Sequence, residues 1–272
     1  MMDVSRPLPR LAFGPGGIVP GDRRLPAEVA VALSFNGTTQ AVMMATPADL
    51  EDFALGFALT EGIAAKDEID SLTVVETVGG IDVQVWLRAE AEARLANRRR
   101  TMAGPVGCGL CGIDSLAEAV RALPPVPASG LHLTPEQILA AVAALPGGQP
   151  LHDATRAAHA AGFWMPDQGM VAVCEDVGRH NALDKLAGFL SRTGEDCTGG
   201  AVVLTSRLSL DLVQKCAVMG VPMMIAVSAP TTAAVALAEN CGITLIALAR
   251  ADRFEVFTHL ARILTKEVAN VA

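Results

Sequence analysis

The sequence lacks two features of membrane and exported proteins. No apolar run approaches the length needed to cross a membrane, and residues 1–26, rich in Pro and Gly, contain no continuous apolar stretch of the signal-peptide kind. An excess of basic residues is also absent, since 21 Lys and Arg stand against 29 Asp and Glu and the net charge is −8. We therefore expect a cytoplasmic protein with no membrane or nucleic-acid partner. Any site for a polyanion must then be a local arginine cluster.

A second C-x-x-C pair is also lacking, because Cys108 and Cys111 alone have this spacing among the six cysteines. A structural zinc site usually takes two such pairs, or one pair and two spaced histidines, so no zinc is expected. A thioredoxin-type redox pair would follow a strand directly, whereas residues 101–106 have a loop pattern. The remaining interpretation of Cys108 and Cys111 is that they provide a reactive thiol that carries or transfers a chemical group. The other cysteines are most simply reduced core residues.

The surroundings of this pair favour a thiolate, the form in which a thiol is nucleophilic. With an ordinary pKa of about 8.5, few thiols are ionised at neutral pH without help. Ser115 and Glu118 form a capping box that predicts a helix just after the pair, and residues 98–100 are three arginines just before it. Glycines flank and separate the two cysteines, which predicts a mobile, accessible loop.

The composition and the positions of the proline- and glycine-rich segments predict two domains. The chain has 272 residues, of which 51% are apolar and 18% charged. Residues 1–26 are expected to be a flexible leader. Residues 27–123 are expected to form a small α+β domain that ends in the C-x-x-C loop and its helix. The Pro-rich segment 124–130 is the predicted linker to a second domain over residues 131–272.

The first domain has the pattern of two hairpins around a helix. Strand-like runs at 29–35 and 39–45 meet at Asn36-Gly37, which suits a type I′ turn, and a second hairpin spans 72–87. Between them, Thr46 is predicted as an N-cap with Pro47 at the first helical position. Phe53 and Phe57 fall on one face of this helix and are predicted core residues.

In the second domain, strands rich in Val, Ile and Leu alternate with amphipathic helices. Two strand-like segments lie around residues 166–169, the second of them over 170–174, and further strands are predicted at 201–204, 223–227 and 243–248. The predicted helices are 135–145, 181–190, 209–219 and 232–240, with a last helix from about Thr258. This alternation predicts an α/β fold with a largely parallel sheet covered on both faces.

Ligands of such sheets bind outside the carboxyl ends of the strands, and the loops expected there carry several hydroxyls, helix N-termini and four arginines. The arginines are Arg179, Arg207, Arg250 and Arg253. Since guanidinium groups and helix N-termini bind phosphate oxygens, we expect a phosphorylated, nucleotide-like ligand. The alternative is that Arg179 and Arg207 pair with Glu175, Asp176 or Asp211 and only fix the loops.

Two histidines accompany these arginines. His180 stands at a predicted helix start and either binds ligand or holds a loop, and His159 lies in an apolar setting typical of a core histidine. For Asp184 and Lys185, further along the helix of His180, a salt-bridge or capping role is expected.

The assembled motifs carry a resemblance to a known family. They are Cys108-Gly-Leu-Cys-Gly112, the run Glu175-Asp-Val-Gly-Arg-His-Asn-Ala-Leu-Asp-Lys185, Leu212-Val-Gln-Lys215, Ser228-Ala-Pro-Thr231, Arg253-Phe-Glu-Val-Phe-Thr-His259 and the helix from Ala54 to Gly62. From about Ala27 to His259, the chain resembles the formate dehydrogenase accessory sulfurtransferase family, also called FdhD.

The resemblance implies a sulfurtransferase with a cysteine persulfide intermediate. A cysteine desulfurase would donate the sulfur, and molybdenum bis-molybdopterin guanine dinucleotide would accept it before entering formate dehydrogenase. The resemblance also implies a homodimer and a C-terminal cytidine-deaminase-like α/β/α domain of three layers, with a pocket that a guanine nucleotide such as GDP can occupy.

The resemblance also implies the site residues. Cys108 is the expected carrier, with Cys111 assisting or resolving. Expected to bind the cofactor are Phe254, Glu255, Val256, Phe257, Thr258, His259, Arg179, His180, Asn181, Arg207, Ser228, Pro230, Thr231 and His159. This chain departs from the family at Arg156 and Ser206, where glycine is usual, and at Cys174, where arginine is usual. The first two are expected to reshape the nucleotide pocket.

The sequence argues against one other function and is compatible with another. A zinc deaminase needs His-x-Glu at one helix start and Pro-Cys-x-x-Cys at the next, whereas the corresponding residues 180–182 and 205–207 offer neither the ligands nor the glutamate. A chaperone that binds the molybdenum cofactor without transferring sulfur is compatible with the sequence.

Overall fold

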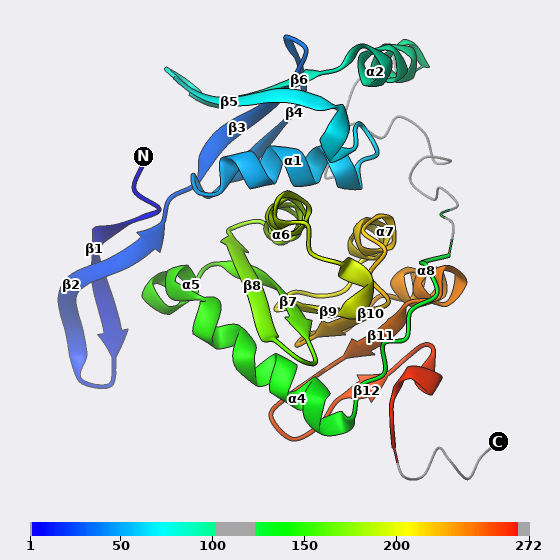
Figure 1. The fold of residues 1–272 in the computed structure, drawn as a ribbon. Helices are drawn as coiled ribbons and strands as arrows, with labels where there is room; N and C mark the ends of the chain where they lie inside the picture. The colour runs from blue at the N-terminus through cyan, green and yellow to red at the C-terminus, as the bar shows by residue number, and fades with distance from the viewer. Residues whose placement is uncertain (1, 102–122, 124, 266–272) are drawn as a thin grey trace.

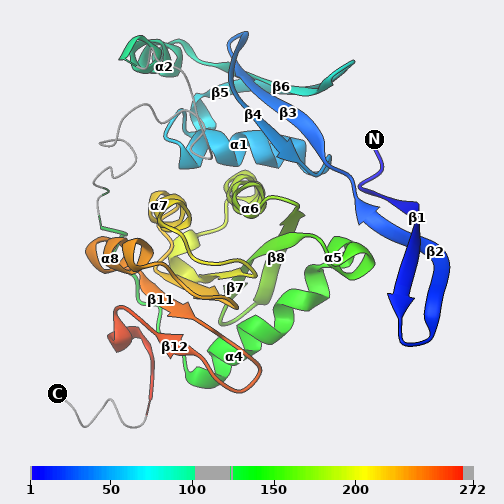
Figure 2. The ribbon, with the colours of Figure 1, turned by 180° about the vertical axis from the view of Figure 1, so that it is seen from behind.

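The computed structural model describes residues 2–101, 123 and 125–265 of the chain. The predicted C-x-x-C loop and the helix after it lie outside the described residues. Within the described part, no helix is long and apolar enough to cross a membrane. The elements stack as a four-stranded sheet, helix α1, helices α6 to α8, a six-stranded sheet and helix α4, as Figures 1 and 2 show from opposite sides.

The four-stranded sheet contains both predicted hairpins. Its order is β4-β3-β6-β5, with the strands β3 (Val29–Phe35), β4 (Thr38–Ala45), β5 (Ile69–Thr77) and β6 (Gly80–Leu87). Asn36 and Gly37 both have positive φ, 47° and 73°, as a type I′ turn requires. Helix α2 (Ala89–Thr101) follows β6. The hairpin predictions are therefore confirmed.

Helix α1 (Leu50–Thr60) packs on one face of this sheet, with Phe53 fully buried and Phe57 5% exposed, as predicted. The helix begins later than expected. Asp49, in the left-handed conformation, is the N-cap, and the prediction of Thr46 as N-cap is wrong. The Thr46 hydroxyl instead accepts a hydrogen bond from the Val177 N–H, directly after the strand Gly169–Asp176 of the six-stranded sheet.

The six-stranded sheet has the order β12-β11-β10-β9-β7-β8. Its strands are β7 (His159–Met165), β8 (Gly169–Asp176), β9 (Ala201–Leu204), β10 (Met223–Ala226), β11 (Thr244–Ala247) and β12 (Glu255–Val256). Only β9, β10 and β11 are mutually parallel; β7 runs antiparallel to β8 and β9, and β12 to β11. The prediction of a largely parallel sheet is therefore wrong, because β7, which lies between β9 and β8, and the edge strand β12 run opposite to the other four strands.

Helices cover both faces of this sheet. One face packs against α6 (Arg179–Thr193), α7 (Leu210–Val218) and α8 (Thr232–Cys241), and the other against α4 (Pro135–Ala144). Helix α4 begins with the predicted cap, since the Thr134 hydroxyl accepts from the Gln137 N–H. A short helix, α5 (Pro150–Thr155), precedes β7. The structure is thus a mixed α/β fold.

The last predicted helix, from about Thr258, is not present in the described residues. The chain there forms the edge strand β12 and a 3₁₀ turn, Leu260–Arg262. The Thr258 hydroxyl donates to the Ile243 carbonyl (2.6 Å) and accepts from the Leu245 N–H (2.8 Å), so it is bound to β11 and is not available as a helix cap.

Residues 1–26 also differ from the prediction, which expected a flexible leader. They contain a hairpin of β1 (Ser5–Gly14) and β2 (Gly17–Pro26). Prolines argued against strands here, but proline is tolerated at the edge of a sheet, and both strands of a two-stranded hairpin are edge strands.

The two sheets are held together by an unusually close crossing of α1 and α6. A Cβ atom placed on Gly56 would overlap the Asp184 carbonyl, and one on Gly188 would overlap the Asp52 carbonyl. The missing side chains let the two backbones touch. The crossing therefore fixes how the four-stranded sheet with α1 lies on α6 and the six-stranded sheet.

Two buried lysines, Lys215 and Lys185, strengthen this contact through ion pairs. Asp184 and Lys185 thus have the salt-bridge role that the sequence predicts for them. Lys215 donates to Asp184 (2.9 Å) and to Glu61, the residue that caps the C-terminus of α1 (2.7 Å). Lys185 pairs with Asp176 (2.7 Å) and donates to the Thr46 carbonyl (3.0 Å). Burial by itself would lower the pKa of Lys215, but the two carboxylates raise it above its ordinary value. The lysine is therefore charged.

We predict that Gly188→Ala lowers the free energy of unfolding by about 3 kcal/mol, the upper end of the usual cost of overpacking, because a backbone carbonyl cannot move aside cheaply. Gly130→Ala is the matched control, since a Cβ there meets no atom within 4 Å. Urea denaturation of both variants checks this. Equal stability of the two would contradict the close crossing.

Candidate functional site

One edge of the six-stranded sheet gathers the loops predicted to bind a ligand. Strands β9, β10 and β11 are parallel, and β8 has the same direction as β9 because both are antiparallel to β7. The carboxyl ends of these four strands, and the start of β7, therefore lie at one edge. Their loops contain Arg179, Arg207, Ser228 and His159, so the predicted convergence of these loops is confirmed.

Backbone hydrogen bonds join neighbouring loops along this edge. The Leu208 N–H donates to the Ala229 carbonyl (3.2 Å), and the Thr231 N–H donates to the Leu208 carbonyl (2.9 Å). The Arg250 guanidinium donates to the Val227 carbonyl, which ties the loop after β11 to the loop after β10. Pro230 forms a bridge with Leu208, and the Thr231 hydroxyl caps α8. These loops form one continuous rim.

The carboxylates that could have neutralised Arg179 have other partners. Glu175 accepts from the Leu151 and His152 N–H groups (2.7 Å each), at the start of α5. Asp176 is buried with Lys185, as described above, and Asp211 accepts from the His180 ring. Glu175, Asp176 and Asp211 are therefore each bound to a group other than Arg179. The described structure does not support the alternative in which Arg179 only pairs with one of them.

Arg179 itself, the first residue of α6, lies half-buried with no hydrogen-bonding group of the described chain at its Nε atom. A buried guanidinium N–H without an acceptor is costly, so an acceptor from a ligand would stabilise it. The pKa of His159 lies below its ordinary value, mainly because the ring is partly buried and secondly because of the positive charge of Arg179. The site therefore combines a positive charge with a neutral imidazole, which suits an anion.

Two other polar residues of the prediction, His180 and Asn181, hold the loops. The His180 Nε2 lies 3.1 Å from the Asp211 carboxylate, and this hydrogen bond lowers the pKa of Asp211. Because a carboxylate only accepts, Nε2 carries a proton. The Asn181 amide is buried and donates to Asp176 and to the Met44 carbonyl (2.9 Å each), so it fixes the loop before α6.

The segment from Phe254 to His259 starts at the site edge and ends at the opposite edge, because β12 runs antiparallel to β11. Glu255 lies opposite Ala247, near the carboxyl end of β11. Phe254 and Val256 pack on the core, whereas Phe257 is exposed. Thr258 is bound to Ile243 and Leu245, and His259 lies against Glu239 at the end of α8. The described structure thus does not bring Thr258 and His259 to Arg179.

Two of the departures from the family pattern have clear positions. Arg156 has a φ of 59°, a left-handed conformation that favours glycine, and its exposed side chain pairs with Asp153. Ser206 is buried and its hydroxyl donates to the Arg207 carbonyl, while Arg207 is exposed. The Arg156 side chain therefore does not fill the site.

Sequence reasoning missed Thr46 as a residue that shapes the site, and it named Asp211 only as a possible partner of the arginines, not of His180. The Thr46 N–H donates to Asp176 (3.0 Å), and its hydroxyl accepts from Val177 (3.2 Å). These contacts span about 130 residues, and no sequence spacing could have indicated them. The Ser209-x-Asp211 helix start was visible, but not its contact with His180.

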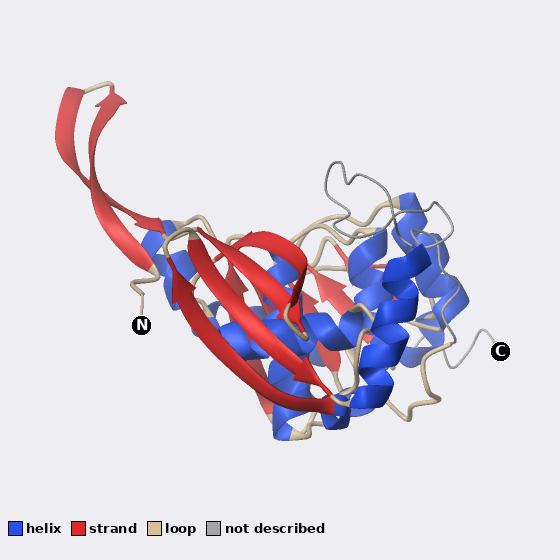
Figure 3. Ribbon diagram, turned by 90° about the horizontal axis from the view of Figure 1, so that it is seen from above, coloured by secondary structure: helices blue, strands red, loops and turns tan. Residues whose placement is uncertain are grey.

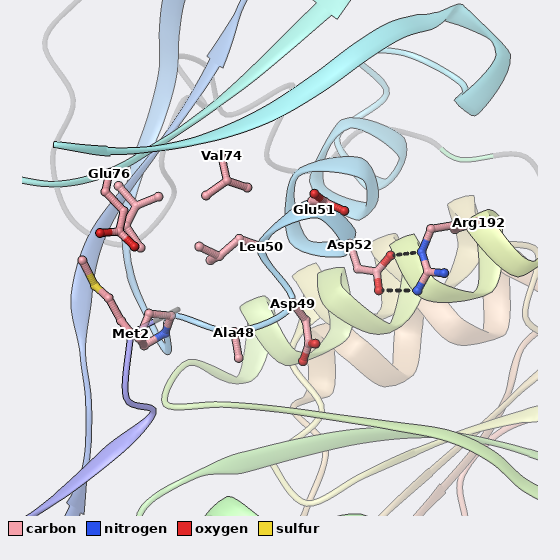
Figure 4. Close-up of a pocket in the computed structure, with 11 residues that line it drawn as sticks. Met2, Ala48, Asp49, Leu50, Glu51, Asp52, Val74, Glu76 and Arg192 are labelled. Carbon is pink, nitrogen blue, oxygen red and sulfur yellow. Dashed lines mark hydrogen bonds and ion pairs between the residues drawn. The ribbon is translucent and has the colours of Figure 1, made fainter.

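A separate cavity of about 560 Å³ lies between the four-stranded sheet and the start of α1 (Figure 4). Asp49, Glu51 and Glu76 line it, and Asp52 is paired with Arg192 by two hydrogen bonds of 2.7 and 2.9 Å. Its acidic lining disfavours an anionic ligand, so this cavity is not the site predicted for phosphate groups.

The described cysteines are poor nucleophiles. Burial raises the pKa of Cys174 to about 12 and that of Cys197 to about 11, and it also raises the pKa of Cys216 and of Cys241. Within the described residues, no group of three or more His, Cys, Asp or Glu side chains could hold a metal ion. The remaining two thiols, Cys108 and Cys111, lie outside the described residues.

We predict that a Cys108→Ala/Cys111→Ala double variant shows no rapidly reacting thiol toward a disulfide reagent at pH 7.5 while folded, because only a thiolate reacts quickly. Adding denaturant should expose all four remaining thiols. Wild type under the same conditions is the control and should show rapid thiols. A fast thiol in the folded double variant would contradict the burial described here.

Comparison with known proteins gives a consistent result. A model of the FdhD/NarQ family matches residues 26–264. "Sulfur carrier protein FdhD" of Agrobacterium fabrum is 52% identical over 261 residues, which cover 95% of this chain and 96% of that protein. The protein of the same name from Brucella abortus is 50% identical over 262 residues, covering 96% and 97%.

The fold also matches a solved structure. A candidate formate dehydrogenase accessory protein from Desulfotalea psychrophila has a TM-score of 0.74 and 26% identity, covering 96% of this chain and 100% of that one. With the family model spanning both sheets and the relatives matching nearly end to end, the chain belongs to the FdhD/NarQ family.

Proposed function

We propose that the protein is a sulfur carrier that takes persulfide sulfur from a cysteine desulfurase and delivers it to molybdenum bis-molybdopterin guanine dinucleotide for formate dehydrogenase. The names of the relatives support the sulfur-carrier part of this proposal. The observation that supports an anionic acceptor is Arg179, half-buried at the sheet edge, whose Nε atom has no hydrogen-bond partner among the described residues.

The sheet edge is suited to the phosphates of such a cofactor. Arg179 would donate to a phosphate oxygen, and the N-terminus of α6 adds the positive end of a helix dipole at the same point. The exposed Arg207 lies on the neighbouring loop of the rim. A guanine nucleotide such as GDP would occupy the same place, in a domain of the cytidine-deaminase-like kind.

Sulfur transfer to the carrier is a simple exchange between thiols. The Cys108 thiolate attacks the terminal sulfur of the donor persulfide, the donor S–S bond breaks, and the donor cysteine leaves as a thiolate. Cys111 can then attack the sulfur of Cys108 itself, which forms a disulfide and releases sulfide to the acceptor. Burial raises the pKa of the described thiols, so this proposal assigns the reactive roles to Cys108 and Cys111.

Intact mass spectrometry after incubation with a cysteine desulfurase and cysteine tests the carrier role. We expect wild type to gain the mass of one sulfur atom, removable by reductant. Cys108→Ala should lose this gain and Cys111→Ala should retain it, because Cys111 acts after loading. No gain in wild type would instead favour a cofactor chaperone that transfers no sulfur.

Titration with GDP tests the anion site. We expect Arg179→Gln to weaken binding by roughly 10- to 100-fold, the value of a hydrogen bond to a charged group. Arg88→Gln is the matched control, because Arg88 is an exposed arginine at the end of β6 and should leave affinity unchanged. Equal affinity of the two variants would remove Arg179 from the site.

A further inference from the structure

His180 and Asp211 form a hydrogen-bonded pair at the edge of the six-stranded sheet where the loops converge. His180 is the second residue of α6 and Asp211 the second residue of α7. These helices lie next to each other between the two sheets (Figures 1 and 2), beneath the four-stranded sheet when the molecule is seen from above (Figure 3). The His180 Nε2 lies 3.1 Å from the Asp211 carboxylate, which also accepts from the Ser209 hydroxyl (3.3 Å). Two helix starts thus hold one imidazole.

The pairing determines which nitrogen of the His180 ring can accept a proton. Nε2 carries the proton that it donates to Asp211, so Nδ1 of the neutral ring has the free lone pair. Within the described part of the chain, no group donates a hydrogen bond to Nδ1. The side chain of His180 is 31% exposed and that of Asp211 32%, so a ligand can reach the ring. An imidazole oriented by a carboxylate is a typical proton-transferring pair.

The groups around this ring belong to the proposed anion site. Arg179 precedes His180 in α6. Partial burial lowers the pKa of His159 most, and the positive charges of Arg179 and His180 add to this effect, so the three side chains lie within electrostatic range. The Nδ1 atom of His159 faces the Thr205 hydroxyl at 3.5 Å. Of the described histidines at this edge, His180 is the one whose ring is bound to a carboxylate.

The proposed sulfur transfer, on which this inference rests, leaves one proton to be removed at the acceptor. When Cys111 attacks Cys108, the S–S bond of the persulfide breaks, and its outer sulfur leaves as hydrosulfide, HS⁻, with the electron pair of that bond. A sulfur that binds a metal gives up its proton. Transfer to molybdenum therefore ends with sulfide on the acceptor and one proton for a nearby base.

We propose that His180 is this base and that Asp211 is its positioning residue. The Nδ1 lone pair of His180 forms a bond to the proton, the S–H bond breaks, and its electron pair stays on the sulfur. The resulting imidazolium donates to Asp211 through Nε2, and the carboxylate stabilises its charge. The proton passes to water before the next transfer. No electrons are gained or lost in this step, so it needs no further reagent.

Single-turnover transfer of labelled sulfur from loaded protein to saturating molybdenum cofactor, measured over a range of pH, tests the proposal. Wild type should transfer more slowly at acidic pH, because a protonated imidazole accepts no proton. His180→Gln should slow transfer about 100-fold at neutral pH, the lower end of the usual effect of a general base, and should lose this pH dependence. Asp211→Asn should also slow transfer, because its amide can donate to Nε2 and leave the ring proton on Nδ1.

His132→Gln is the matched control and should transfer at the wild-type rate. His132 is exposed, and the Leu133 N–H beside it donates to the Arg262 carbonyl. Arg262 in turn donates to Thr244 at the start of β11, so His132 lies toward the sheet edge opposite the site.

Rescue by added imidazole separates a base from a structural role. Imidazole should accelerate His180→Ala about tenfold or more and leave wild type unchanged, because a small base can occupy the place of the missing ring. Wild-type rates in His180→Gln, an acid limb retained in that variant, or no rescue of His180→Ala would overturn the proposal.

Sulfur loading of each protein is measured by intact mass before transfer. A wild type that loads no sulfur contradicts the proposed function, and this inference with it. A wild type that loads and transfers sulfur no faster than His180→Gln contradicts this inference alone.

Discussion

The backbone contact between α1 and α6 is the constraint on which the rest of the structure depends. Gly56 and Gly188 allow the two helices to touch, and each would overlap a carbonyl oxygen of the other helix if it carried a Cβ atom. The apolar side of α1 is meanwhile buried on the four-stranded sheet through Phe53 and Phe57. One helix therefore belongs to two interfaces, and the first sheet is fixed to the second through it.

The crossing also determines the shape of the candidate site. It brings Thr46, at the end of β4, against the loop that precedes α6. Lys185 neutralises Asp176 there, and a buried carboxylate without its partner would cost about 3–5 kcal/mol. With Asp176, Glu175 and Asp211 each bound elsewhere, Arg179 has positive charge to offer a ligand. The candidate anion site proposed above thus depends both on the four-stranded sheet with α1 and on the six-stranded sheet with α6.

Much of the fold could be predicted because it depends on local patterns. The hairpin at Asn36-Gly37, the cap at Thr134 and the strand over residues 201–204 each follow from a few adjacent residues. The loops at the sheet edge were predictable because strands of one direction end at one edge, whatever the order of the strands.

Apart from the hairpin within residues 1–26, whose strands pair locally, the incorrect predictions share a physical cause, which is a distant partner. Thr46 was expected as a helix cap, but it is bound to Asp176 and Val177 across the interface. Thr258 was expected to begin a helix, but β11 binds its hydroxyl. The strand order and the reversal of β7 are properties of the whole sheet. Periodicity along the chain contains none of this information.

The measurement that tests the account most directly follows labelled sulfur from the carrier to the cofactor. Protein loaded with radioactive persulfide sulfur is mixed with molybdenum bis-molybdopterin guanine dinucleotide, and label is counted on both over time. The account predicts that label leaves wild type for the cofactor and stays on Arg179→Gln, which loads normally but binds the acceptor weakly. Equal transfer from both proteins would contradict the claim that this sheet edge holds the sulfur acceptor.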